Sequence, residues 1–361
     1  MTCRERVLAA LRHEPTDRVP RLLYGEAIAY APAIAALLEA RCAPLTPRQY
    51  FDMDITGAAL APTRLDAARF APWLGARAGQ ALASGAVDEW GVWWRRGSFH
   101  HFAHIESPLR QVESLSQLEE YPWPDVDAPY RCAGLAEQVA ALHDQGLAVA
   151  AFAGSVFEQS WYLRGMDELM MDMLAEPERA HWILERTAHY QKVAAVAFAR
   201  AGVDILITGD DVAMQEGLMM DRATWRAFLQ PRLAATVAAA RTVRPDLHVF
   251  YHSDGNVEPL IPDLIEVGID ILNPVQPECM DPAAIKAKYG DRLSFWGTVS
   301  VQHTMPQGTP DQVRAEVRQR IRTAGRGGGL ILAPAHVLTP EVPWENIAAF
   351  FAAAGTEPVP S

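Results

Sequence analysis

Three potential metal ligands stand close behind apolar stretches of the sequence. His252 and His336 each end such a stretch, and Cys279 comes a few residues after another. A helical pattern follows each of the three. In a parallel βα fold, the carboxyl ends of successive strands converge on one face, where active sites are built. A histidine, a cysteine and a second histidine that meet there could hold a zinc ion with an open fourth position.

Carboxylates follow other predicted strands. Asp210 and Asp211 are adjacent, so their charges repel, and one raised pKa could make a general acid. A helix cap or a solvated loop is the alternative for this pair. Glu158 could be an acid, a metal ligand or half of a buried ion pair. Asp254, shortly after the first histidine, is either a further candidate metal ligand or a turn residue before the next helix.

Several side chains near the predicted strand ends are candidates to contact a substrate. Most are aromatic or apolar and would suit an aromatic or apolar substrate. In a barrel, such residues also commonly form the core. The candidates are Tyr24, Glu26, Phe157, Trp161, Met214 and Trp296.

Strands and helices alternate regularly over residues 131–361. Near-continuous apolar runs suit strands covered on both faces, and the β-then-α order predicts a parallel sheet. With an early strand at residues 19–24, the strand number favours a closed (β/α)8 TIM barrel, and no Gly-rich dinucleotide fingerprint supports an open sheet. Later strands are expected at residues 147–153, 204–208, 247–251, 270–273, 293–297 and 329–333, and helices at 166–174, 177–201, 222–243 (interrupted near Pro231), 282–289, 310–324 and 344–354.

Residues 1–130 are less regular and form an extension plus the first strand, within one domain that spans residues 1–361. Trp90, Trp93 and Trp94 could cap the bottom of the barrel or pack the face of a homodimer. The extension is expected to contain helices at residues 4–13 and 27–40, and a hairpin with strands at 88–96 and around 98–104 that turns near Gly97.

Composition narrows the class of protein. Lysine plus arginine number 32 and aspartate plus glutamate 44, a net charge of −12. This argues against a nucleic-acid binder, which needs a basic face. The four cysteines form no C-x-x-C pair and no disulfide framework. No apolar stretch approaches a membrane span, and the first residues lack the apolar core of a signal peptide. We therefore expect a cytoplasmic protein that binds neither nucleic acid nor membranes.

A set of short motifs is spread along nearly the whole chain. The motifs are Arg-Glu-Arg-Val-Leu-Ala-Ala-Leu at 4–11, Asp-Arg-Val-Pro at 17–20, Asp-Glu-Trp-Gly at 88–91, Gly-Asp-Asp at 209–211, Trp225, Pro-Arg at 231–232, Phe-Trp-Gly-Thr at 295–298 and Gly-Gly-Gly-Leu-Ile-Leu-Ala-Pro at 327–334. Singly most are weak signals, but together they resemble the uroporphyrinogen decarboxylase superfamily. The resemblance implies a TIM barrel.

The superfamily has at least two functional branches. One decarboxylates uroporphyrinogen without a metal, and the other comprises zinc methyltransferases that move a methyl group between a small molecule or thiol and a corrinoid on a partner protein. The decarboxylases typically carry Met-Arg-Gln-Ala-Gly-Arg after the first strand, where this chain has Leu-Leu-Tyr-Gly-Glu-Ala at 22–27. A substrate with many carboxylates needs guanidinium partners, and a glutamate would repel it. Porphyrinogen decarboxylation is therefore not expected.

The thiol-methylating members carry a His-x-Cys pair after one strand and a cysteine after the last. His252 matches the histidine, but Asp254 replaces the cysteine of the pair and His336 replaces the last cysteine. Cys279 offers a thiolate from the strand between them. The resemblance thus implies a rebuilt site with harder ligands. It is closest to the O-demethylase-like members, which pass methyl groups from methyl ethers to cob(I)alamin.

The favoured hypothesis is therefore a zinc-dependent methyltransferase that takes a methyl group from a small methylated donor, such as a methyl ether, to a corrinoid protein. Zinc would be held by His252, Cys279 and His336, and one of the strand-end carboxylates would supply a proton. The alternative is a decarboxylase or lyase, metal-free or metal-assisted, that acts on a small carboxylic acid. A non-catalytic binding protein is the third hypothesis, and the many polar groups at the strand ends argue against it.

Overall fold

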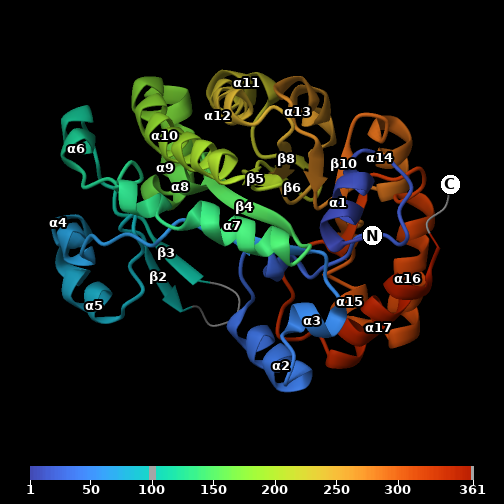
Figure 1. Cartoon of the computed structure of the whole chain (residues 1–361). Coiled ribbons are helices and arrows are strands. Elements are labelled where there is room, and N and C mark those ends of the chain that lie inside the picture. Colours follow the sequence, from blue (N-terminus) through green and yellow to red (C-terminus); the bar gives the residue numbers. More distant parts are fainter. Residues whose placement is uncertain (97–102, 359–361) are drawn as a thin grey trace.

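The computed structural model describes residues 1–96 and 103–358. Its centre is a curled sheet of seven parallel strands (Figure 1). The order of the strands across the sheet follows their order in the chain, as βα repetition requires. The strands are β1 (Ile55–Ala58), β4 (Ala148–Ser155), β5 (Ile205–Gly209), β8 (His248–His252), β9 (Ile271–Asn273), β10 (Ser294–Val299) and β11 (Leu330–Pro334).

Residues 20–22 close the gap between the first and last strands. The N–H of Leu332 in β11 donates to the carbonyl oxygen of Pro20 (2.8 Å). On the other side, the N–H of Asp54, just before β1, donates to the carbonyl oxygen of Arg21 (3.1 Å). Seven strands and this one segment complete the ring of a (β/α)8 barrel. The predicted fold class is confirmed.

The sequence does not predict strand β1, because the segment is short and is not continuously apolar. Gly57 shows what shapes this strand, because a Cβ atom at that position would lie 2.5 Å from the carbonyl oxygen of Ala27. Close tertiary packing, and not intrinsic β-propensity, therefore makes the segment a strand. The other strands lie where the apolar runs predict them, and the early strand is reduced to residues 20–22.

Helices cover the outside of the barrel, and α16 illustrates why they form. The Thr309 side chain accepts from the N–H of Gln312, whose side chain reaches back, which satisfies the first turn. Val313, Val317 and Ile321 then form the buried face.

In the described parts of the chain no helix has the length and apolar character needed to cross a membrane. The larger helices are α7 (Leu135–Asp144), α10 (Pro177–Ala201), α12 (Gln230–Val243), α13 (Ile261–Val267), α14 (Pro282–Tyr289), α16 (Pro310–Thr323) and α17 (Trp344–Thr356), and the shorter ones between them are α8 (Phe157–Arg164), α9 (Met166–Ala175), α11 (Arg222–Phe228) and α15 (Thr304–Gln307).

Strand β4 shows how the barrel separates its inside from its outside. Ala148 and Ala150 belong to the interior cluster that contains Trp296. Val149 and Ala151, which alternate with them, pack in a second cluster with residues of α7 and α10. Inward and outward positions can therefore be assigned along this strand up to its carboxyl end.

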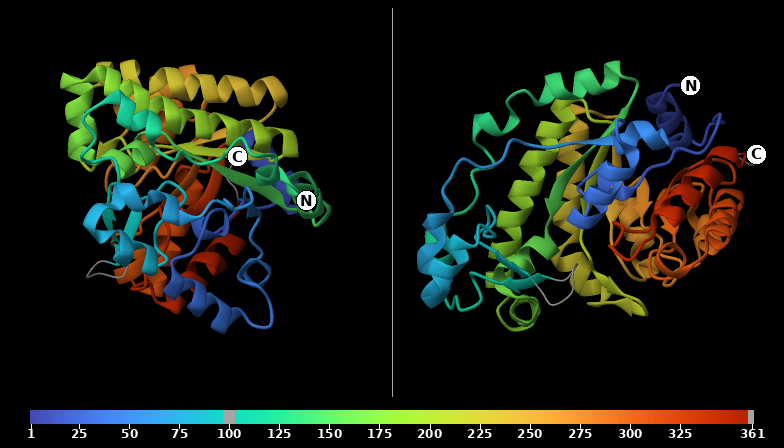
Figure 2. Two further views of the ribbon diagram at one scale, coloured as in Figure 1. Left: turned by 90° about the vertical axis from the view of Figure 1, so that its left-hand side faces the viewer. Right: turned by 90° about the horizontal axis from the view of Figure 1, so that it is seen from below.

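The part of the extension that contains α4, α5, α6 and the hairpin lies to one side of the barrel, away from α14 and α16 (Figures 1 and 2). Strands β2 (Trp93–Arg96) and β3 (Ala103–Glu106) pair antiparallel, as predicted, and the turn expected near Gly97 falls outside the described residues. Trp90 and Trp93 are both buried, and Trp90 belongs to the core cluster of the extension. In the described part of the extension, five further α-helices precede or follow the hairpin: α2 (Pro32–Cys42), α3 (Pro47–Phe51), α4 (Ala71–Leu74), α5 (Ala78–Ala83) and α6 (Leu115–Glu120).

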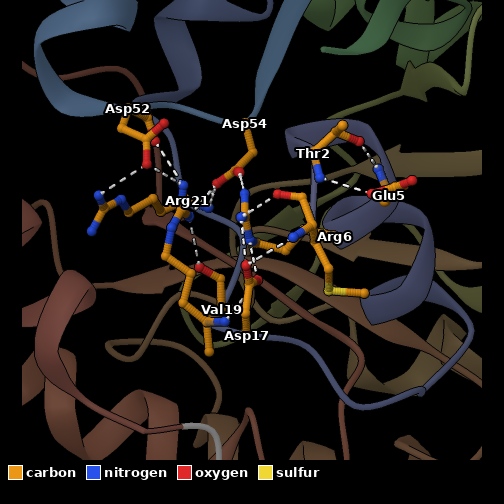
Figure 3. A network of polar contacts seen from close by, with 10 residues as sticks. Thr2, Glu5, Arg6, Asp17, Val19, Arg21, Asp52 and Asp54 are labelled. Atoms are coloured by element: carbon orange, nitrogen blue, oxygen red, sulfur yellow. Dashed lines mark hydrogen bonds and ion pairs between the residues drawn. The ribbon is translucent and has the colours of Figure 1, made fainter. Parts of the chain in front are cut away.

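A buried polar network joins α1 (Cys3–Leu11) to the closing segment (Figure 3). The Asp54 carboxylate is fully shielded from solvent and accepts from Arg6 Nη1 (2.5 Å), Arg18 Nη1 (2.6 Å) and the Arg21 N–H (2.8 Å). Arg6 also binds Asp17 through Nε (2.5 Å). This network holds residues 17–21 where they complete the barrel, which explains why the motifs at 4–11 and 17–20 occur together.

Replacing Asp54 by alanine is expected to destabilise the protein by about 3–5 kcal/mol, because the buried Arg6 and the partly buried Arg18 lose their shared carboxylate. Asp52 is a matched control, since its side chain is 65% exposed and binds Arg18 at the surface. Asp52→Ala should cost at most about 1 kcal/mol. Denaturant-induced unfolding would measure both, and equal destabilisation by the two variants would contradict this account of the network.

Candidate metal centre and substrate cavity

The carboxyl ends of the strands deliver most of the predicted chemical groups to one place. His252 is the last residue of β8, and its neighbours across the sheet are Gly209 in β5 and Asn273 in β9. Gly209 is required there because a Cβ atom at that position would lie 2.7 Å from the His252 Cβ. His336 follows β11 and brings a second imidazole beside the first, with ring centres 5.8 Å apart.

His252, Asp254 and His336 form a candidate metal centre. One potential ligand atom from each lies within 4.8 Å of the others. His252 Nε2 is 3.8 Å from Asp254 Oδ1, and His336 Nε2 is 4.0 Å from Asp254 Oδ2. Asp254 Oδ1 is buried and has no hydrogen-bond partner. A buried carboxylate oxygen without a partner is costly, and a cation would satisfy it. Two imidazoles and a carboxylate are an established type of ligand set for catalytic zinc.

Asn273 orients His252 toward this centre. Asn273 Nδ2 donates to the carbonyl oxygen of Trp296 (2.7 Å), which turns Oδ1 toward His252 Nδ1 at 2.5 Å. Because Oδ1 can only accept, Nδ1 carries the hydrogen and Nε2 presents its lone pair to the cluster. Burial lowers the pKa of His252, but the Asp211 and Asp254 carboxylates and the Asn273 bond more than offset it, so the pKa is raised.

Replacing Asn273 by leucine is expected to weaken metal binding by about 10–100-fold, the usual cost of losing an outer partner of a ligating histidine. Asn273→Asp keeps an acceptor for Nδ1–H and should retain most of the affinity. Competition with a chromophoric chelator would measure both variants. Wild-type affinity in the leucine variant would show that this hydrogen bond does not orient the ligand.

The three predicted acids occupy different positions. Glu158 lines a cavity and accepts from Ser155 Oγ and Tyr162 OH, both at 3.0 Å. Burial, and then the Asp211 charge, raises the pKa of Glu158. The Asp211 carboxylate lies 3.5 Å from His252 Nε2 and accepts from the Asp254 N–H at 2.7 Å.

Asp210 is buried and does not line the cavity. Its carboxylate accepts from the N–H of Glu158 (3.0 Å) at the start of α8. Burial raises the pKa of Asp210 well above its ordinary range. Its contacts are those of a group that holds α8, and with it Glu158, in place.

A cavity of about 530 Å³ opens beside the metal centre. Of the six predicted substrate contacts, only Tyr24 lines it, with its ring stacked on His252 at 5.9 Å. Several of its residues were not predicted as substrate contacts, because they come from the extension, the inward face of β4 and helices α8 and α10, and their position in the sequence does not show that they face a cavity. The unpredicted lining residues are Ile28, Ala29, Glu89, Trp90, Phe152, Gly154, Ser155, Gln159, Tyr162, Tyr190 and Gly209.

The other predicted substrate residues lie away from the cavity wall. Phe157 and Trp296 are fully buried in the barrel core, and Trp161 packs against that core. Met214 is 59% exposed in the short strand β6 (Ala213–Met214). Glu26 accepts from Tyr30 OH (2.9 Å), and burial raises its pKa. A position at the end of a strand therefore predicts that a residue lies near the site, but it does not predict whether the side chain faces the cavity.

Cys279, the third predicted ligand, is not among the three residues whose ligand atoms gather within 4.8 Å. Its thiol donates to Gln276 Oε1 at 3.4 Å. Strand β9 ends at Asn273, and the chain then turns through Val275, which has a positive φ of 49°, before it reaches Cys279. The cysteine therefore lies on the loop beyond the strand, and Asp254 completes the cluster instead.

Fold and site together define a parallel βα barrel whose strand ends carry a candidate metal centre. Within that class, the chain belongs to the uroporphyrinogen decarboxylase (URO-D) family, whose model matches residues 91–356. This confirms the resemblance seen in the sequence.

Named relatives are methyltransferases. The methylcobamide:CoM methyltransferase MtaA of Methanosarcina barkeri is 29% identical over 201 residues, which are 53% of this chain and 56% of that protein. A methylated-thiol–coenzyme M methyltransferase of Methanosarcina mazei is 23% identical over 254 residues, 67% of this chain and 63% of that protein. The chain thus spans a little over half the length of the MtaA that it matches. A solved methyltransferase from Methanosarcina mazei shares the fold over 98% of both chains, with a TM-score of 0.70 and 20% identity.

Proposed function

We propose that this protein is a metal-dependent methyltransferase that passes a methyl group from a small methylated compound to a corrinoid carried on a partner protein. The observation that carries the proposal is the His252–Asp254–His336 cluster at the edge of a cavity that Glu158 also lines. The names of the two relatives support methyl transfer as the reaction class.

Zinc is the metal that this ligand set suits best. The three side chains would leave a fourth position open, as catalytic zinc sites do. Bound zinc would act as a Lewis acid toward the heteroatom that carries the methyl group. Compared with a cysteine-rich site, two imidazoles and a carboxylate are harder ligands and suit an oxygen-bearing donor such as a methyl ether.

The chain's own residues would position the donor and manage its proton. When the methyl group leaves, the heteroatom keeps the electron pair of the broken bond and needs a proton. Glu158 lies in the cavity, and burial raises its pKa, which favours the protonated form, so Glu158 would donate the proton to the heteroatom. The Asp211 carboxylate would compensate positive charge at His252, and Asp210 would hold the start of α8 in place through its bond with the Glu158 N–H.

The alternative reaction, decarboxylation of a small acid, has less support in the site. A carboxylate substrate needs a cationic or donor-rich partner. None of the described residues that line the cavity is a lysine or an arginine. A metal-free decarboxylase would therefore have only hydroxyl, amide and imidazole donors to hold its substrate.

Elemental analysis joined to a transfer assay would test the proposal. The chelator-washed and zinc-reloaded protein should retain about one metal ion per chain. It should then convert cob(I)alamin to methylcobalamin in the presence of a methyl ether, followed by absorbance. A protein that retains no metal, or a metal-loaded protein that transfers no methyl group from ethers, amines or thiols, would overturn the proposal.

A further inference from the structure

Of the described residues that line the cavity, four carry a hydroxyl group, and three of these hydroxyls already donate to a carboxylate. Ser155 Oγ and Tyr162 OH donate to Glu158, both at 3.0 Å. Tyr190 OH donates to another carboxylate of the cavity wall at 2.7 Å. The fourth hydroxyl belongs to Tyr24, and within the described parts of the chain it forms no hydrogen bond. Because buried polar groups are normally paired, a free hydroxyl at this place is available to a ligand.

The Tyr24 hydroxyl can be reached from the cavity although the residue is buried. Tyr24 is only 5% exposed, yet its hydroxyl is not sealed off from the cavity that the residue lines. A phenylalanine would fill the same space, so packing alone does not account for the oxygen atom. The hydroxyl therefore differs from those of Tyr162 and Tyr190, which hold carboxylates of the wall in place.

The ring of Tyr24 is fixed between the barrel core and the two histidines of the metal centre. It stacks on Phe250 and on His252, with ring centres 6.1 and 5.9 Å apart. It meets Trp296 and His336 edge to face, at 6.2 and 6.4 Å. Phe250 and Trp296 are themselves fully buried. A ring held on several sides gives its hydroxyl one direction, as a preorganised hydrogen-bond donor requires.

The groups that would carry out the reaction surround this hydroxyl. Burial, and then the charges of Asp254, Glu158 and Asp211, raise the pKa of Tyr24, so all three carboxylates lie within electrostatic reach of the hydroxyl. Asp254 is a candidate metal ligand, and Glu158 is the candidate proton donor. The heteroatom of a methyl donor that approaches both the metal centre and Glu158 would therefore lie next to the Tyr24 hydroxyl.

We propose that Tyr24 is a further catalytic residue, whose hydroxyl donates a hydrogen bond to the heteroatom of the methyl donor as that atom gains negative charge. The inference rests on the proposed function for the reaction itself. When the bond between the methyl carbon and the heteroatom breaks, the methyl group passes to the corrinoid and the heteroatom keeps the electron pair. Tyr24 would stabilise this charge and keep its own proton, and Glu158 would supply the proton that completes the leaving group.

Azide binding to the cobalt-loaded protein tests this hydrogen bond without any methyl transfer. Co²⁺ in place of zinc gives visible absorbance bands that change when a ligand enters the open position. Tyr24→Phe keeps the ring and removes one oxygen atom, so it should retain the metal but bind azide about ten-fold more weakly, because a hydrogen bond to an anion is lost. Tyr50→Phe, at an exposed tyrosine of α3, is the matched control and should bind azide like the wild type. Wild-type azide affinity in Tyr24→Phe, or equal weakening in Tyr50→Phe, would overturn the inference.

A second variant separates the hydroxyl of Tyr24 from its ring. Tyr24→Leu removes the ring that stacks on His252, so it should weaken metal binding as well. Tyr24→Phe keeps that contact and should have the metal affinity of the wild type, measured by competition with a chromophoric chelator. Equal loss of metal affinity in both variants would show that Tyr24 only supports a metal ligand, which contradicts a role at the reacting atom.

Methyl-transfer kinetics should show the effect of Tyr24→Phe in kcat. Removal of one donor to a developing charge typically lowers kcat by about 10²–10³-fold. KM should change little, because the heteroatom of the bound donor gains its charge only as the bond breaks. Glu158 keeps both of its hydroxyl partners in this variant, so the fall of kcat with rising pH that Glu158 would cause should persist. A raised KM with unchanged kcat would overturn the catalytic role.

The inference and the proposed function can fail separately. Weaker azide binding in Tyr24→Phe, with no methyl transfer by the wild type, would overturn the proposed function and support the hydrogen bond inferred for Tyr24. Methyl transfer by the wild type, with kcat and azide affinity both unchanged in Tyr24→Phe, would support the proposed function and overturn the role of Tyr24.

Discussion

Replacing His252 by alanine is expected to leave the protein unable to retain a metal ion and to abolish methyl transfer. His252 Nε2 lies 3.5 Å from Asp211 and 3.8 Å from Asp254, and its ring is oriented by Asn273. Loss of the imidazole would leave one histidine and a carboxylate. The affinity for the metal ion should fall by more than the roughly 10–100-fold that is lost when a hydrogen-bond partner of a ligating histidine is removed. Metal content after dialysis against a chelator would measure the effect.

Three further variants make this experiment specific. His189→Ala removes an exposed histidine that binds Asp127 on the outer surface, and it should keep the metal. Asp254→Asn should lose it, because Asp254 supplies the carboxylate of the cluster. Cys279→Ser should keep it. If Cys279→Ser lost its metal while Asp254→Asn retained it, the third ligand would be Cys279, as expected from the sequence, and not Asp254.

The fold was predictable where local pattern and tertiary environment agree. Strands such as β5 and β8 are buried on both faces, so apolar character alone marks them. Strand β1 was not predictable, because Gly57 is there to admit the backbone of Ala27, a contact made with a segment far away in the sequence. The same holds for the Asp54 network, whose three arginine partners come from α1 and the closing segment.

The candidate site was predictable in part, for a related reason. A residue at a strand end is placed near the active face by topology, which brings His252 and His336 together. Topology does not say which way a loop turns after the strand, and on the loop after β9 the Cys279 thiol bonds Gln276 and is not one of the three clustered ligands. It also does not reveal the cavity wall, since Trp90 and Glu89 enter from the extension and Phe152 depends on the alternation within β4.

Replacing Glu158 by glutamine is expected to lower kcat by about 10²–10⁴-fold, the usual contribution of a general acid. Glutamine keeps the size but has no acidic proton to give; its amide oxygen can accept from one of the two hydroxyls, Ser155 or Tyr162, and its NH2 group would donate to the other. Metal content should be unchanged, since Glu158 is outside the ligand cluster. Glu178→Gln, on the exposed first turn of α10, is the matched control and should retain full activity.

The pH profile distinguishes proton donation from a structural role of Glu158. Burial and the Asp211 charge raise the pKa of Glu158, so the protonated, active form persists above the ordinary range of a glutamic acid. In the wild type, kcat should therefore be highest below this raised pKa and fall as the pH increases through it. In Glu158→Gln, that decline should disappear, and the low residual rate should be flat over the same range. A variant that is slow but keeps the wild-type decline would show that another group donates the proton, and Asp211 would then be the residue to replace, because it is the nearest remaining carboxylate to His252 Nε2 at 3.5 Å.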